Sequence, residues 1–179
     1  QRVKAQGGTI RLATPVQAIR FIAEGVLRLE TADGPVEHDH VIATCSPQQM
    51  LDLTPGLPDG YASKLAALKS MGATALILAL KRPLTEGHYW INVPASEGLP
   101  FIGLIEHTNY ISPEHYGGDH LIYCGNYLPP DHAHFDASKQ DLLALYLPGI
   151  STINPDFEAG WVRDSWLFTA KYAQPVPGM

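Results

Sequence analysis

The sequence predicts an α+β fold, the class in which strands and helices occupy separate stretches of the chain. Three observations carry this prediction. Short apolar runs separated by turn residues fill the first 45 residues, helix-capping signals follow at Ser46 and Pro47, and longer apolar runs divided by a further helix fill the rest. The length of 179 residues suffices for a domain with a substantial core and a smaller lobe.

The first 45 residues have the pattern of a small antiparallel β-meander. Apolar runs lie at 9–13, 16–21 and 26–31. Asp33-Gly34 favours a hairpin turn, because both residues tolerate positive φ. A further aliphatic run, 41–44, predicts a buried strand. A meander this small cannot bury both of its faces, so we expect it to pack against another part of a protein.

Helices and then a sheet are predicted after the meander. Ser46 is a good N-cap and Pro47 suits the first helical position. Apolar residues at helical spacing predict a second helix over 60–71. The continuously aliphatic run 73–80 is typical of a central strand, in a mixed sheet with flanking helices. Further strand-like runs lie at 88–93, 101–107, 120–128 and 161–172, with a helix over 136–146 between the last two.

Composition and charge exclude several functions. Twelve Lys and Arg against eighteen Asp and Glu give a formal net charge of −6, which argues against a nucleic-acid partner, since phosphate binding needs a clustered basic surface. Cys45 and Cys124 lie far apart and are typical of small buried residues, so we expect a reducing, cytoplasmic compartment. A peripheral location at a membrane is left open. The longest apolar run, 72–80, is far shorter than the ~20 residues of a membrane-spanning helix.

Both ends of the sequence suggest a piece of a longer polypeptide. Residues 1–6 have the pattern of the last turns of a helix, closed by Gly7 and Gly8. Residues 173–179 form a Pro-rich connection. We therefore expect an internal segment, and the alternative is a small natural protein with frayed ends.

Metal and hydrolase chemistry find little support in the sequence. His38 and His40, like His132 and His134, lie two residues apart and would share one face of a strand. Neither pair has a convincing third ligand nearby, and exposed histidines of turns and edges explain both, so we expect no metal. The sequence also contains no Gly-rich phosphate loop and no Gly-x-Ser-x-Gly nucleophile motif.

Aromatic residues on neighbouring predicted strands form the strongest candidate site. Tyr89, Trp90, Tyr123 and Tyr127 would line an apolar cavity with few polar points, and core packing is the alternative. The run 101–110 ends in Glu, His, Thr, Asn and Tyr, which places polar groups at a sheet edge. The carboxylate and imidazole would orient a ligand or transfer protons, and a hydrogen-bonded corner is the alternative.

Several segments follow one another in an order and spacing that are similar to one superfamily. They are Gly7-Gly8, Ile10, Leu12, Thr14, Val16 and Ile19; then 31–34; then 40–44 with Pro47; then 89–92, Pro100-Phe101, 106–109, 116–118, His120-Leu121 and Tyr127; and finally 173–176. Together they resemble the middle of a flavin amine oxidoreductase. This superfamily includes amine oxidases, protoporphyrinogen oxidase and phytoene-type desaturases.

The resemblance implies an FAD-binding domain, interrupted in sequence, and a substrate domain. Residues 1–52 would be the meander lobe of the FAD-binding domain, and 53–179 the substrate domain. The main chain of Val16 would meet the adenine of FAD, while Thr44 and Pro47 would pass near the dinucleotide. The resemblance and the strand-end placement together suggest five substrate-binding residues, with no catalytic base assigned: Trp90, Phe101, Glu106, Asn109 and Tyr127.

The parent enzyme, on this resemblance, would oxidise an amine or an apolar, porphyrinogen- or polyene-like substrate by hydride transfer to flavin. The glycine fingerprint of a dinucleotide site is absent from this sequence. We therefore expect the chain alone to be inactive and to bind FAD weakly or not at all. Its expected partners are the missing FAD-binding portion and, through the uncovered meander surface, a second copy. The alternatives are a non-enzymatic α+β module that binds an apolar ligand, and an interaction domain that pairs by a sheet edge.

Overall fold

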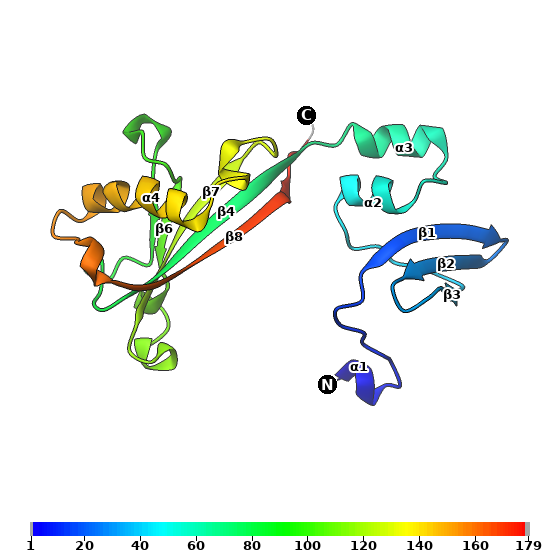
Figure 1. The fold of residues 1–179 in the computed structure, drawn as a ribbon, viewed down its shortest axis with the longest axis horizontal. Coiled ribbons are helices and arrows are strands. Elements are labelled where there is room, and N and C mark those ends of the chain that lie inside the picture. The colour runs from blue at the N-terminus through cyan, green and yellow to red at the C-terminus, as the bar shows by residue number, and fades with distance from the viewer. Residues whose placement is uncertain (1, 178–179) are drawn as a thin grey trace. The chain divides into compact units, whose positions relative to one another are not determined.

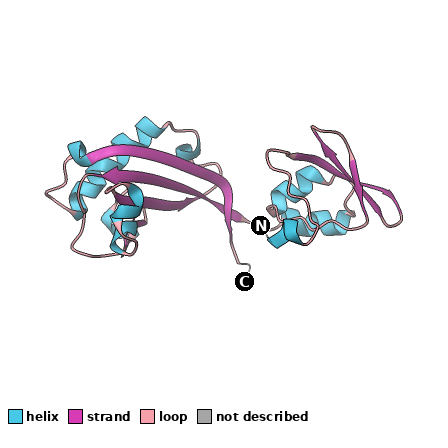
Figure 2. Cartoon of the chain, turned by 90° about the horizontal axis from the view of Figure 1, so that it is seen from below, coloured by secondary structure: helices cyan, strands magenta, loops and turns pink. Residues whose placement is uncertain are grey.

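The computed structural model describes residues 2–177 and confirms the α+β class. Residue 1 and residues 178–179, the outermost parts of the two predicted terminal segments, lie outside this description. Figures 1 and 2 show the elements of the chain, which divides into two compact units. Each unit is described by itself.

The division between the units falls between Lys69 and Ser70. The helices α2 (Pro47–Leu53) and α3 (Asp59–Ala66) contact each other and both belong to the first unit. The boundary after residue 52, which the family resemblance implies between a flavin-binding part and a substrate-binding part, stays a prediction.

The first unit contains a three-stranded antiparallel sheet in the order β1-β2-β3. Its strands are β1 (Val16–Ala23), β2 (Val26–Thr31) and β3 (Val36–His38). At the turn between β2 and β3, Gly34 has a φ of 107° and its N–H donates to the Thr31 carbonyl at 3.0 Å. The predicted turn at Asp33-Gly34 is confirmed. The short helix α1 (Arg2–Ala5) precedes the sheet and is followed by Gly7 at a φ of 83°.

Two predicted strands of the first unit are wrong. Residues 9–13 and 41–44 form no strand in the described chain, and the side chains of Leu12 and Ile42 are 83% and 91% exposed. A strand is stabilised by backbone hydrogen bonds to a neighbouring strand, and within this unit neither segment has such a neighbour. Residues 41–44 therefore have the aliphatic pattern of a buried strand, but the described part of this unit has no strand with which they pair.

The helices of the first unit follow their capping signals. The Ser46 side chain accepts the Gln49 N–H at 3.2 Å, and the Gln49 side chain accepts the Ser46 N–H at 3.1 Å, so the two residues form a capping box at the start of α2. Pro47 occupies the first turn, as predicted. α3 ends at Ala66, earlier than predicted, because the chain becomes extended from Ser70 onward.

The second unit is built on a five-stranded sheet in the order β5-β6-β7-β4-β8. Every strand pair that the structure describes in it is antiparallel, whereas we expected a mixed sheet. The long strands β4 and β8 lie side by side, as Figure 1 shows. The strands are β4 (Ser70–Leu80), β5 (Trp90–Asn92), β6 (Gly103–Glu106), β7 (His120–Leu128) and β8 (Val162–Pro175).

One face of this sheet is covered by the helix α4 (Lys139–Ile153). Leu142, Tyr146 and Ile150 of α4 are fully or almost fully buried against a row of β4 leucines. The helix continues through Pro148, which is exposed, beyond the predicted end near Tyr146. The helix continues because its buried apolar stripe packs on the sheet. This packing stabilises the helix by more than it loses through the one backbone hydrogen bond that Pro148 cannot donate. Among residues 2–177, no helix is long and apolar enough to cross a bilayer.

Candidate functional site

The second face of the five-stranded sheet is open and rich in aromatic side chains. Along β4 the residues that face the core, such as Leu76 and Leu78, have no exposed surface, whereas Ala75 and Ile77 between them are partly exposed. Side chains of a strand alternate between the two faces. The register therefore assigns the following side chains to the open face: Trp90, Ile105, Tyr123, Tyr127, Ile77, Trp166 and Phe168.

Two of the five predicted substrate-binding residues lie on this open face. Trp90 of β5 is 55% exposed and Tyr127 of β7 is 50% exposed. Both line a groove of about 370 Å³ over the middle of the sheet. The indole N–H of Trp90 donates to the Asn92 side-chain oxygen at 2.7 Å, which fixes the ring at the groove's edge. The structure thus brings Trp90 and Tyr127 to one surface that a ligand can reach.

A second hollow of about 390 Å³ lies further along the same face. It is lined by four aromatic side chains, by two aliphatic ones and by one carboxylate: Tyr116, Tyr123, Trp166, Phe168, Ile77, Leu121 and Asp119. The Tyr116 hydroxyl and His107 Nε2 are 2.7 Å apart and share a hydrogen bond. Burial, followed by the nearby tyrosines, raises the pKa of Tyr123, so this phenol stays neutral and serves as a hydrogen-bonding group at ordinary pH.

The other three predicted substrate-binding residues pack in the core or hold a turn. Phe101 is 1% exposed and packs on Tyr146, with ring centroids 5.5 Å apart. Glu106 has no exposed surface, and its carboxylate accepts hydrogen bonds from the chain at Leu84 and Thr85. Asn109 donates to Thr85 Oγ1 at 2.9 Å. Phe101, which precedes β6, and Glu106 are buried in the core, and Asn109 holds a turn, so the open face does not include these three residues. Their role in substrate binding stays a prediction.

Sequence reasoning missed several residues of the open face. Trp166 and Phe168 were read only as part of an aromatic strand, and Gly103 and Gly125 were not considered. The missing signal was the register, since only the pairing of strands shows which residues form one row across the sheet. Alternation of side chains along 120–128 is the signal that could have placed Tyr123, Gly125 and Tyr127 on one side.

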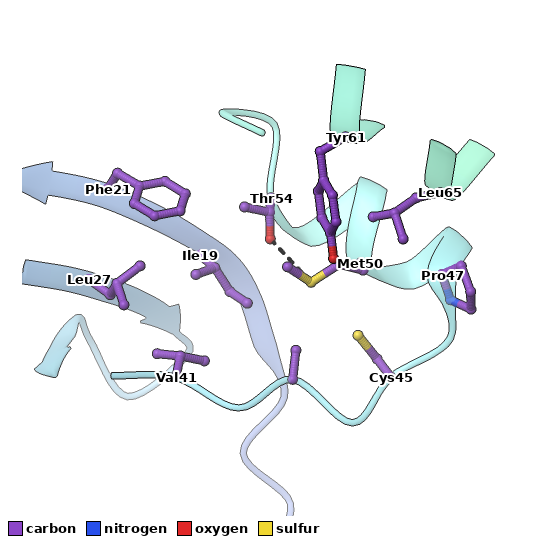
Figure 3. Close-up of a pocket in the computed structure, with 11 residues that line it drawn as sticks. Ile19, Phe21, Leu27, Val41, Cys45, Pro47, Met50, Thr54, Tyr61 and Leu65 are labelled. Carbon is purple, nitrogen blue, oxygen red and sulfur yellow. Dashed lines mark hydrogen bonds between the residues drawn. The ribbon is translucent and has the colours of Figure 1, made fainter. Parts of the chain in front are cut away.

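The first unit has its own apolar cavity of about 450 Å³, shown in Figure 3. Ile19 and Phe21 of β1 border it on one side, and Met50 of α2 and Tyr61 of α3 on the other. The Thr54 hydroxyl contacts the Met50 sulfur at 3.7 Å. Phe21 and Tyr61 remain 61% and 51% exposed, so this small core is only partly closed.

The three predicted flavin-contacting residues do not converge on one hollow. Val16, at the start of β1, lines a hollow of about 420 Å³ beside β2 and β3, whereas Pro47 lines the cavity of Figure 3. Thr44 is exposed and lines neither of these hollows. The Gln49 N–H at the start of α2 is already bound by Ser46, whereas a dinucleotide needs backbone N–H groups free for phosphate. Weak or absent FAD binding by the chain alone stays a prediction.

His132 and His134 contact each other, whereas His38 and His40 are exposed. The rings of His132 and His134 lie 4.4 Å apart, and the backbone N–H of His134 donates to His132 Nδ1 at 3.2 Å. Burial, and then the neighbouring His132, lowers the pKa of His134. Among residues 2–177, no group of three or more His, Cys, Asp or Glu side chains is placed to hold a metal ion.

Solved structures share the fold of this chain. A candidate protoporphyrinogen oxidase from Exiguobacterium sp. 255-15 matches with a TM-score of 0.77 at 18% identity, over 95% of this chain and 37% of that one. An oxidoreductase from Methanosarcina mazei gives 0.70 at 21% identity, over 95% and 40%. Reduced UDP-galactopyranose mutase gives 0.73 at 16% identity, over 97% and 37%. The chain thus spans about two fifths of the length of the structures that it matches.

The family assignment rests on a match over almost the whole chain. The family model described as flavin containing amine oxidoreductase matches residues 1–178. The chain belongs to the flavin-containing amine oxidoreductase family, which confirms the superfamily that the sequence resembled. A comparison with curated proteins found no match.

Proposed function

We propose that this chain is part of an FAD-dependent oxidoreductase and that the open face of its five-stranded sheet is the wall of the substrate site. The observation that carries the proposal is the exposure of aromatic side chains on that face. Trp90, Tyr127 and Phe168 are half or more exposed on a sheet whose other face packs against α4 along β4. Exposed apolar surface of this kind marks a binding site, and membership of a flavin-containing family supports an oxidation reaction.

The cofactor, in this proposal, is held mainly by segments outside residues 1–179. Support comes from the share of the matched structures that the chain spans and from the first unit, where Val16, Thr44 and Pro47 do not form a common site. The isolated chain should then be inactive. When bound in the whole protein, flavin would supply the acceptor for a hydride from the substrate. We further propose a cytoplasmic location, consistent with the free thiols of Cys45 and Cys124.

A non-enzymatic binding module is the second candidate function. The groove between Trp90 and Tyr127 would by itself accept an apolar ligand, without any flavin. This alternative predicts that binding at the groove completes the function of the chain. The flavoprotein proposal predicts instead that the groove faces a flavin supplied by the rest of the protein.

The proposal is tested with the purified chain and with the longer polypeptide that contains it. Titration of the 179-residue chain with FAD should leave flavin fluorescence unquenched up to micromolar concentrations. Tighter binding would contradict the proposal that segments outside residues 1–179 hold most of the cofactor. The longer polypeptide should purify with FAD bound. Substrate added without oxygen should bleach its visible absorbance, more slowly in Tyr127→Ala than in Tyr127→Phe, which keeps the ring. A longer polypeptide that binds no flavin would overturn the proposed function.

A further inference from the structure

The open face contains a groove whose floor consists of small residues. Gly103, Gly125 and Ala75 are register partners on β6, β7 and β4, so they form one row across three neighbouring strands. A Cβ atom placed on Gly125 would meet nothing within 4 Å, and one on Gly103 would meet only the Ile91 carbonyl oxygen at 3.8 Å. Both glycines therefore leave open space above the sheet where other residues would fill it.

Larger side chains border this floor on both sides. The next row on one side contains Trp90, Ile105 and Tyr123, which are register partners, and on the other side stands Tyr127. Rows on one face lie about 7 Å apart along the strands, and neighbouring strands are about 5 Å apart. The floor is thus about 10 Å long across its three strands and lies between walls about 14 Å apart. A shallow, flat-bottomed groove of this shape suits fused planar rings.

The groove carries no charge of its own. Among the described residues that line it, none has an acidic or basic side chain. Its polar side chains are uncharged, namely those of Thr74, Asn92, Asn126 and Tyr127, and the Asn92 oxygen accepts the Trp90 indole N–H. An ammonium group bound here would lose its water without a carboxylate to replace it. An uncharged ring would instead bury its faces against Trp90 and Tyr127.

We propose that this groove binds an uncharged, flat ring system of the substrate and discriminates against amines. The inference rests on the proposed function, because it takes the open face as the substrate wall, and it adds the chemical class of the substrate. Aromatic faces also attract cations, so the comparison of a neutral with a charged ligand decides the matter. Stacking on Trp90 and Tyr127 orients the ring, and the glycine floor allows it to approach the sheet.

The test uses three probes that differ in one property each. Naphthalene-2-methanol is flat and uncharged, 2-naphthylmethylamine has the same ring with a positive charge at neutral pH, and decahydronaphthalene-2-methanol is uncharged but puckered. Each is titrated into the 15N-labelled 179-residue chain. We expect naphthalene-2-methanol to shift the amide signals of Gly103 and Gly125 and the indole signal of Trp90 in a saturable manner. The indole of Trp161, which is buried elsewhere in the core, should not move.

Two glycine variants supply the matched comparison. Gly125→Ala adds a methyl group to the groove floor and should weaken binding of naphthalene-2-methanol at least tenfold. Gly160→Ala, at another glycine whose Cβ would meet nothing within 4 Å, lies outside the groove and should leave binding unchanged. Should Gly125→Ala fail to fold, Tyr127→Leu removes an exposed wall instead and should weaken binding in the same direction.

Several outcomes would overturn the inference. They are equal or tighter binding of the amine, equal binding of the puckered ring, and shifts that avoid Gly103 and Gly125. Failure of the proposed function is a different result, because it appears as a longer polypeptide without flavin whatever the probes do. A flavin-containing protein with an amine-binding groove would leave the function standing and refute only the substrate class.

Discussion

The buried carboxylate of Glu106, at the end of β6, binds the turn that contains Leu84 and Thr85. Its oxygens accept the N–H groups of Leu84 and Thr85, each at 2.8 Å, and the Thr85 hydroxyl at 2.6 Å. Asn109 extends the network by donating to Thr85 Oγ1 and to the His88 carbonyl oxygen. The polar residues that end this strand thus satisfy the backbone of a neighbouring loop, which a buried loop requires.

Removal of the Glu106 carboxylate should destabilise the second unit. Glu106→Ala leaves one buried and one partly buried N–H group without an acceptor, so we expect the free energy of unfolding to fall by about 3 kcal/mol. Glu106→Gln keeps one acceptor oxygen and should cost less. Urea unfolding followed by tryptophan fluorescence measures both, with Glu97→Ala on an exposed turn as the control. Unchanged stability in Glu106→Ala would contradict the structural role.

At the scale of elements, β4 depends on a glycine for its contact with the turn that precedes α4. The Phe135 ring lies directly over Gly72, in the space that a Cβ atom would occupy. The carbonyl oxygen of Ala170 on β8 would be only 3.0 Å from that Cβ. The absence of a side chain at residue 72 therefore lets the tip of the Phe135 ring contact the strand and lets β8 approach it.

Gly72→Ala should consequently loosen this packing. We expect a loss of about 1–3 kcal/mol in the free energy of unfolding, which is typical of overpacking. Replacement of the ring in the double variant with Phe135→Ala should relieve the clash, so the two changes should be less than additive. Gly125→Ala, where a Cβ meets nothing, serves as the matched control in the same sheet. Additive losses measured by thermal unfolding would show that Phe135 and residue 72 do not interact.

The elements that local signals determine were predictable, and those that depend on distant partners were not. Ser46 with Pro47 and the Asp33-Gly34 turn are specified within a few residues, and both predictions were confirmed. The segment 41–44 needs a strand that this unit does not supply. The candidate site divides in the same way, because the aromatic residues were visible in the sequence. The row of Gly103 with Gly125 depends on strand register, which hydrophobic pattern alone did not reveal.

At the scale of the whole molecule, the first unit exposes more apolar surface than a small soluble domain usually does. Ile42 is 91% exposed, Leu12 83% and Phe21 61%. The segment 41–44 also has unpaired backbone groups, as an edge strand has. Exposed apolar surface of this size raises the free energy of the chain in water, and burial of the surface against another polypeptide lowers it. In the isolated chain, a second copy is the available partner.

We therefore expect the 179-residue chain to self-associate through its first unit. Light scattering coupled to size-exclusion chromatography should show a mass that rises from monomer towards dimer with concentration. Ile42→Lys places a charge on the most exposed of these side chains and should shift the equilibrium to monomer, with little effect on folding because the residue is not packed. Leu145→Lys, on the 45% exposed Leu145 of α4 in the second unit, is the matched control and should leave the mass unchanged. A monomer at every concentration, or an equal effect of both substitutions, would refute association through this surface.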